Sequence, residues 1–187
     1  MDINNKVRCG WVSSDPLYIE YHDHEWGKPI YNDHELFELL MLEGFQAGLS
    51  WITVLKKREN FRIAFDGFDP TKVASFTDEK IEELANDNGI IRHRDKIKAT
   101  VKGAQIFQTF GKKEESFSHY LWSFVNHQPI INHCKSLEEV PAISIESTAM
   151  SKSLKKKGFN FCGPTICYAF MQAAGMVNDH TTDCFKR

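Results

Sequence analysis

Glu43 is the residue whose position in this 187-residue sequence conflicts most with its chemistry. It continues a stripe at helical spacing from Leu36 and Leu40, so a carboxylate lies on an apolar helix face. Burying an unpaired carboxylate costs several kcal/mol, which predicts that another group meets Glu43 there. The alternative is that Glu43 ends its helix and turns to solvent.

The residues that follow Glu43 predict a tight turn between two helices. Gly48 can adopt dihedral angles that other residues avoid, which would expose Leu49 at the tip. A second helix then opens near Ser50 and carries the flat aromatic ring of Trp51. An acceptor and an aromatic ring this close together indicate a pocket for a planar, hydrogen-bonding ligand.

A second chemical constellation joins the two ends of the chain. His180 and Cys184 lie about one helical turn apart, and Cys9 and His22 form a similar pair near the N-terminus. Two thiolates and two imidazoles suit tetrahedral zinc, and four protein ligands leave no open position, so the site would be structural. From spacing alone His24 competes with His22, and a chance pairing of cysteine and histidine remains open.

Residues 149–174 predict a helix, a six-residue turn and a second helix. Glycines at Gly158 and Gly163 would let backbone N–H groups approach an anion, and Lys157 ends the basic run of residues 155–157 beside them. This pattern is similar to a helix-hairpin-helix element that grips a DNA phosphate. An ordinary helical hairpin is the alternative.

The whole chain, residues 1–187, is predicted to be all-α and to form one compact domain. Residues 1–14 are expected to be irregular, and Asp15 before Pro16 starts a helix. Residues 127–145 are predicted to be a loop, because polar residues and prolines interrupt any periodicity. No convincing set of alternating strands is present.

Composition excludes several classes of protein. Hydrophobic content of 42% and charged content of 26% are those of a soluble globular protein, and no apolar run is long enough for a membrane span. The N-terminal sequence lacks a signal-peptide core, so we expect a cytoplasmic protein. Five cysteines without a secretory signal argue against a disulfide framework. A net charge of −2 allows DNA binding only if local basic groups share one surface.

Long segments from Arg8 to Cys184 resemble the 3-methyladenine DNA glycosylase I family, a branch of the helix-hairpin-helix glycosylases. The matching segments are RCGWVSSDPLYIEYHDHEWG, LEGFQAGLSWITVLKKREN, GIIRHRDKIKA, LWSFVN, LKKKGFNFCGPTICYAFMQAAG and VNDH-x3-C. The resemblance implies a compact helical enzyme that flips N3-methyladenine out of alkylated double-stranded DNA and hydrolyses its N-glycosidic bond.

The resemblance also implies roles for individual residues. Glu43 falls on the family's base-binding carboxylate, which we take as the catalytic position, and Leu49 beside Gly48 on the residue that fills the gap left by the extruded base. The remaining pocket positions are aromatic, and we expect them at Trp11, Tyr18, Tyr21, Trp26 and Trp51. The family's zinc ligands match Cys9, His22, His180 and Cys184, which selects His22 over His24.

The expected chemistry depends on the charge of the damaged base. Methylation at N3 makes adenine cationic and a good leaving group, so stacking on Trp51 and the negative charge of Glu43 favour it over neutral adenine. Asp179 and Asp183 flank the zinc ligands, and no general base is assigned. The alternatives are a zinc-containing module that binds modified bases without cleaving them, and a metal-dependent hydrolase, which a closed four-ligand site disfavours. We expect a monomer.

Overall fold

The computed structural model describes residues 6–112 and 115–187, and this part of the chain is predominantly helical, as predicted. The first five residues of the segment predicted to be irregular lie outside the described residues. The α-helices are α1 (Pro16–His24), α2 (Asp33–Gln46), α3 (Trp51–Ala64), α4 (Pro70–Val73), α5 (Asp78–Ala85), α6 (Arg94–Phe107), α7 (Phe117–Trp122), α8 (Ile145–Lys157) and α9 (Pro164–Ala173). Short 3-10 turns are η2 (Asp66–Phe68), η3 (Ser123–Val125) and η4 (Leu137–Glu139).

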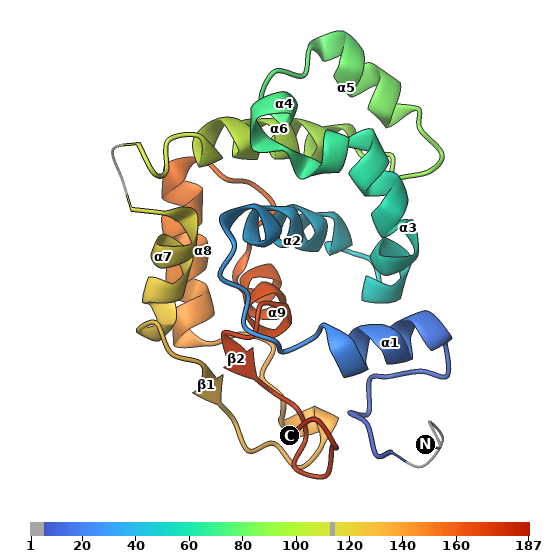
Figure 1. Ribbon diagram of the computed structural model, residues 1–187, viewed down its shortest axis with the longest axis vertical. Helices are drawn as coiled ribbons and strands as arrows, with labels where there is room; N and C mark the ends of the chain where they lie inside the picture. The colour runs from blue at the N-terminus through green and yellow to red at the C-terminus, as the bar shows by residue number, and fades with distance from the viewer. Residues whose placement is uncertain (1–5, 113–114) are drawn as a thin grey trace.

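Helix α2 lies at the centre of the molecule, between α6 and α9 (Figure 1). It also packs against α3 and α7. Every residue from 40 to 45 is buried, so this part of α2 is surrounded by protein on all sides. A carboxylate at Glu43 is therefore inside the core, which confirms the burial that its spacing predicts.

Local signals in the sequence start the helices that surround α2. Asp15 caps α1 by accepting a hydrogen bond from the Leu17 N–H at 3.0 Å, and Pro16 occupies the first helical position. Asn32 caps α2 in the same way, accepting from the N–H groups of His34 and Glu35. The first of these caps confirms the helix start predicted at Pro16, because capping depends on residues only two or three positions apart.

The described residues are all-α apart from one short strand pair, in agreement with the prediction of no set of alternating strands. Two short strands, β1 (Ile130–Ile131) and β2 (Val177–Asn178), pair in parallel, with Ile130 opposite Val177. Two residues are too few to produce an alternating pattern, and the partners lie far apart in the sequence, so no local signal could reveal them. The pairing brings the segment predicted to be a loop, residues 127–145, beside the C-terminal tail.

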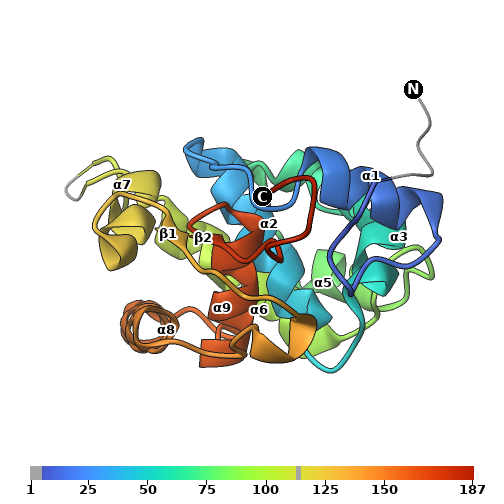
Figure 2. The ribbon, with the colours of Figure 1, turned by 90° about the horizontal axis from the view of Figure 1, so that it is seen from below.

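The two ends of the described chain also meet. The Phe185 N–H donates to the Val7 carbonyl at 3.0 Å, and Figure 2 shows the C-terminal segment lying near α1. Within the described residues, no helix has both the length and the apolar character needed to cross a bilayer.

Candidate functional site

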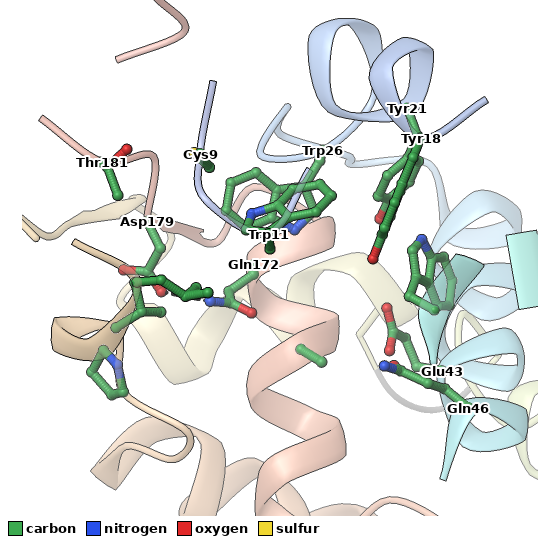
Figure 3. Close-up of a pocket in the computed structure, with 15 residues that line it drawn as sticks. Cys9, Trp11, Tyr18, Tyr21, Trp26, Glu43, Gln46, Gln172, Asp179 and Thr181 are labelled. Carbon is green, nitrogen blue, oxygen red and sulfur yellow. Dashed lines mark hydrogen bonds between the residues drawn. The ribbon is translucent and has the colours of Figure 1, made fainter. Parts of the chain in front are cut away.

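A cavity of about 260 Å³ lies where α1, α3 and α9 meet the buried C-terminal half of α2 (Figure 3). The 3-10 turn η4 and the chain after it close another side. The cavity brings together the aromatic residues that the sequence analysis places in one pocket: Trp11, Tyr18, Tyr21, Trp26 and Trp51. Four of them lie within residues 11–26 and the fifth at the start of α3, and the fold assembles them around one space.

The rings of the cavity contact one another in tilted and edge-to-face arrangements. The Trp11 ring centroid lies 5.0 Å from those of both Tyr18 and Trp26, and the Tyr21 centroid lies 5.6 Å from that of Trp51. The indole N–H groups of Trp11 and Trp51 are buried and make no hydrogen bond with any described residue. The polar groups of buried Tyr and Trp side chains usually have a hydrogen-bond partner. Because these two indole groups have none, they are available as donors to a ligand.

Glu43 points into the same cavity from α2 (Figure 3). It is 2% exposed, and its Oε2 atom makes no hydrogen bond with the described residues. Burial raises the pKa of Glu43 to about 8. Burial, and then the charge of Glu43, raise the pKa of Tyr21 beside it. An unpaired carboxyl group, whose ionised form a nearby cation would stabilise, therefore faces the aromatic residues that line the cavity.

An ion pair joins the two helices that carry Tyr21 and Trp51. Arg58 on α3 binds both carboxylate oxygens of Glu25, at the end of α1, with one N–O distance of 2.9 Å. A bidentate pair of this kind fixes orientation as well as distance. It ties α1 to α3, and so sets the spacing between the two rings that these helices carry.

The turn between α2 and α3 has the predicted form. Gly48 has a φ of +84°, in the region that favours glycine, and no heavy atom would meet a Cβ there within 4 Å. Leu49 is 43% exposed at the tip, and Ser50 is the N-cap position of α3. The exposed tip therefore lies between Glu43 and Trp51 in the sequence, next to the cavity that both residues line.

The second predicted constellation also forms. One ligand atom from each of Cys9, His22, His180 and Cys184 lies within 4.8 Å of all the others, and all four residues are buried. The Cys184 Sγ atom is 3.5 Å from both the His22 Nε2 and the His180 Nδ1 atoms. Two sulfur and two nitrogen atoms this close can surround one metal ion tetrahedrally. His24 is exposed and lies outside the cluster.

The cluster has a supporting hydrogen-bond chain. The Asp23 Oδ1 atom lies 2.8 Å from the His22 Nδ1 atom, and Arg8 binds both oxygens of Asp23. Burial alone would raise the pKa of Asp23, but hydrogen bonds from Arg8 and His22 lower it to about 2. A carboxylate that accepts the Nδ1 proton leaves Nε2 as the nitrogen that faces the cluster.

The hairpin between α8 and α9 is present, although α8 begins four residues before the predicted start at residue 149. Gly158 ends α8 with a φ of +104°, and Gly163 is the N-cap of α9 with open space around it. The Lys157 ammonium lies over the rings of Phe110 and Tyr120, 4.9 and 5.1 Å from their centroids. The role of these residues in DNA binding stays a prediction.

Gln172 and Asp179 are among the polar residues of the cavity that were not assigned a role from the sequence. Gln172 on α9 donates a hydrogen bond to the Asp179 Oδ2 atom at 2.8 Å. Asp179 is 2% exposed and also accepts hydrogen bonds from Asn132 and from the Tyr168 hydroxyl. Asp179 is visible in the sequence only as a neighbour of the metal-ligating residues. Its partners come from distant segments, so no short pattern marks it as part of a cavity.

Comparisons with known proteins agree with this geometry. Residues 11–187 match the model of a family described as methyladenine glycosylase. The chain is 56% identical over 177 residues to DNA-3-methyladenine glycosylase 1 of Escherichia coli (strain K12), covering 95% of each protein. A crystal structure of 3-methyladenine DNA glycosylase I superposes with a TM-score of 0.94 at 54% identity, covering 96% of this chain and 98% of that one.

A further solved structure has a ligand. It is a tyrosine-to-phenylalanine variant of 3-methyladenine DNA glycosylase I in complex with 3-methyladenine. Its TM-score is 0.92 at 40% identity, and the match covers 95% of this chain and 96% of the other. The fold around the cavity is thus shared with a protein that binds a methylated purine.

Proposed function

We propose that this chain, which belongs to the methyladenine glycosylase family, releases N3-methyladenine from alkylated duplex DNA by hydrolysing its N-glycosidic bond and leaves an abasic site. The observation that carries the proposal is the unpaired, buried carboxyl group of Glu43 facing an aromatic cavity. A neutral, polar base would leave that carboxyl group without a counter-charge. A cationic methylated base supplies one.

Base recognition follows from the charges in the cavity. As a cationic base enters, its positive charge favours the ionised form of Glu43, which then accepts hydrogen bonds from the exocyclic amine edge. The ring of Trp51 stacks on the base, and a cationic ring gains more from this contact than a neutral one. Trp11, Tyr18, Tyr21 and Trp26 enclose the remaining edges. Neutral adenine gains from neither charge effect.

The base must leave the duplex before it can reach Glu43. Extrusion costs a few kcal/mol, and a damaged base is easier to extrude than an intact one. We assign Leu49, on the turn shaped by Gly48, to the gap that the extruded nucleotide leaves. We assign the hairpin from Lys157 and Gly158 to Gly163 to a DNA phosphate, which positions the protein without reading sequence.

The bond that breaks is the one between the deoxyribose C1′ atom and the base. Its electron pair goes to the base, which leaves neutral because it carried a positive charge. Water then supplies the new oxygen at C1′ and loses a proton to solvent. Because N3-methylation already makes the base a good leaving group, Glu43 serves by binding and orienting it, and no general base is assigned.

We propose that the Cys–His cluster holds one zinc ion with a structural role. Cys9, His22, His180 and Cys184 would fill all four positions of a tetrahedral ion, which leaves none for substrate. Burial raises the pKa of the Cys9 thiol, so a dication would stabilise the thiolate that burial disfavours. Binding there would tie the N-terminal segment to the C-terminal tail.

We further propose that the protein acts as a monomer in the cytoplasm. One chain supplies every residue that lines the cavity, so a second copy is not needed to complete it. All five cysteines are buried and free, which suits a reducing compartment.

The test is base release from duplex DNA treated with a methylating agent, with the released bases separated by chromatography. We expect 3-methyladenine in solution and abasic sites in DNA whose strands stay intact until they are treated with alkali. Tight binding to the methylated duplex without base release would instead identify a module that recognises modified bases and does not cleave them. The metal content of the purified protein, measured in the same preparation, tests for zinc.

A further inference from the structure

Lys96 is a buried cation that the proposed reaction does not use. It lies in the first turn of α6 and is 6% exposed. Its ammonium donates hydrogen bonds to the carbonyl oxygens of Phe45 at 3.0 Å and Ala47 at 2.8 Å. No carboxylate of the described residues forms an ion pair with it. A well-packed hydrophobic side chain is often at least as stable as a buried charge, so packing alone does not account for a lysine here.

The two carbonyl groups mark the end of α2. The last residue of that helix is Gln46, and its carbonyl accepts from the Leu49 N–H at 2.6 Å. Lys96 takes the carbonyls on either side, those of Phe45 and Ala47. Terminal carbonyls carry partial negative charge, and a cation at a helix C-terminus stabilises them. Lys96 therefore fixes the point at which the chain leaves α2.

The segment that begins at this point carries the exposed tip. After Ala47 the chain turns through Gly48 to Leu49, and α3 then begins at Trp51. The hydroxyl of Ser50, the N-cap residue, bonds the Thr53 hydroxyl and does not cap α3. Lys96 thus supplies two of the hydrogen bonds that fix where this turn starts, and the turn carries the residue assigned to the gap in the DNA.

Lys96 also faces the hairpin. Its Nζ atom lies 5.8 Å from the centroid of the Phe161 ring, which belongs to the connection between α8 and α9. The same connection contacts α2 directly, because a Cβ atom at Gly44 would lie 3.5 Å from the Phe161 carbonyl oxygen. One ammonium group therefore lies between the turn that carries Leu49 and the hairpin assigned to the DNA phosphate.

We propose that Lys96 is a positioning residue that sets the location of the Leu49 turn relative to the hairpin and the base cavity. This inference rests on the proposed function, since it assigns Lys96 to the step that extrudes the base. A misplacement of about 1 Å far from the reacting atoms can cost about a hundredfold in rate. Lys96 acts on the reaction only through Leu49 and its turn, and it does not contact the base.

The test replaces Lys96 with methionine, which keeps the apolar length and removes the charge and the donors. Lys98→Met is the matched control, because Lys98 lies two residues further along α6 and is exposed. We expect single-turnover release of 3-methyladenine from methylated duplex to fall about 10- to 100-fold in Lys96→Met and to stay within twofold of wild type in Lys98→Met. The affinity for free 3-methyladenine should change less than threefold, because Glu43 and Trp51 remain in place.

A double-mutant cycle with Leu49→Ala separates positioning from a general loss of stability. If Lys96 acts through Leu49, Lys96→Met should cost less than threefold in the Leu49→Ala background. Losses that multiply would overturn the proposal, as would parallel losses of base release and free-base affinity. If Lys96→Met does not fold, Lys96→Gln replaces it in the same cycle, and failure of both to fold would show a purely structural role. An inactive wild type would count against the proposed function itself.

Discussion

The base cavity and the Cys–His cluster are adjacent buried sites that differ in whether their polar groups have partners within the chain. They share a wall, since the Trp26 ring lies 4.7 Å from that of His180. In the cluster, the ligand atoms lie against one another, and Asp23 supports His22. In the cavity, the carboxyl group of Glu43 has no counter-charge. The contrast suggests that polar groups satisfied within the chain stabilise the fold, whereas those left without partners bind the substrate.

The largest effect is expected from breaking the cluster. Cys184→Ser should reduce metal content and lower the stability of the protein together, by several kcal/mol, because metal binding free energy at such a site is folding free energy. Cys167→Ser is the control, since Cys167 is buried outside the cluster. Metal analysis measures the metal content of both variants, and thermal unfolding measures their stability. A metal-free Cys184→Ser protein of unchanged stability would remove the structural role.

The cavity should give stability a pH dependence of its own. Burial raises the pKa of Glu43 from 4.5 to about 8, so the folded protein holds a proton that the unfolded chain has released between these values. The contribution of this proton to the free energy of unfolding is fully present below about pH 4.5 and is lost as the pH rises to about 8. The loss is on the order of a few kcal/mol. Urea unfolding of metal-saturated protein at pH 5 and pH 8 measures it. Glu43→Gln should flatten the difference, and an unchanged slope would contradict the assignment.

A smaller effect is expected at the hairpin, which contributes to neither buried site. Gly163 has an ordinary φ and open space, so Gly163→Val should fold normally but block close approach of a phosphate. Affinity for damaged and undamaged duplex should fall alike, by about 2- to 10-fold, the worth of one hydrogen bond. Gly158→Ala is the contrasting change, because a side chain at a φ of +104° is strained and should lower stability. A loss confined to damaged DNA would contradict the role of Gly163.

Features that depend on neighbouring residues could be predicted from the sequence. The cap at Asp15 and the turn at Gly48 depend on residues at most three positions apart, and both are confirmed. The burial of Glu43 also follows from spacing, because α2 is regular and each turn repeats the same face. Local rules are sufficient wherever the physical cause is local.

Features that depend on distant partners could not be predicted in this way. The β1–β2 pair joins segments about 47 positions apart. Spacing alone also left His24 as a competitor of His22 for the metal site. The Lys157 ammonium lies over rings of distant residues, which no pattern near Lys157 reveals. Lys96 reads as one charge in a basic run, and only the fold shows that it is buried against the end of α2.

If the unpaired carboxyl group of Glu43 binds the methylated base, a paired carboxylate on the same helix should not matter, and α2 offers one for comparison. Glu38 lies on the same helix and forms an ion pair with Arg62 at 2.7 Å. The decisive measurement is single-turnover release of 3-methyladenine by Glu43→Gln and Glu38→Gln, with the melting temperature of each. Glu43→Gln removes a hydrogen bond to a charged group, worth about 1.5–3 kcal/mol, so release should fall about 10- to 100-fold while stability holds or rises. Glu38→Gln should keep its activity and lose at most about 1 kcal/mol of stability. Wild-type release by a folded Glu43→Gln protein would contradict the account.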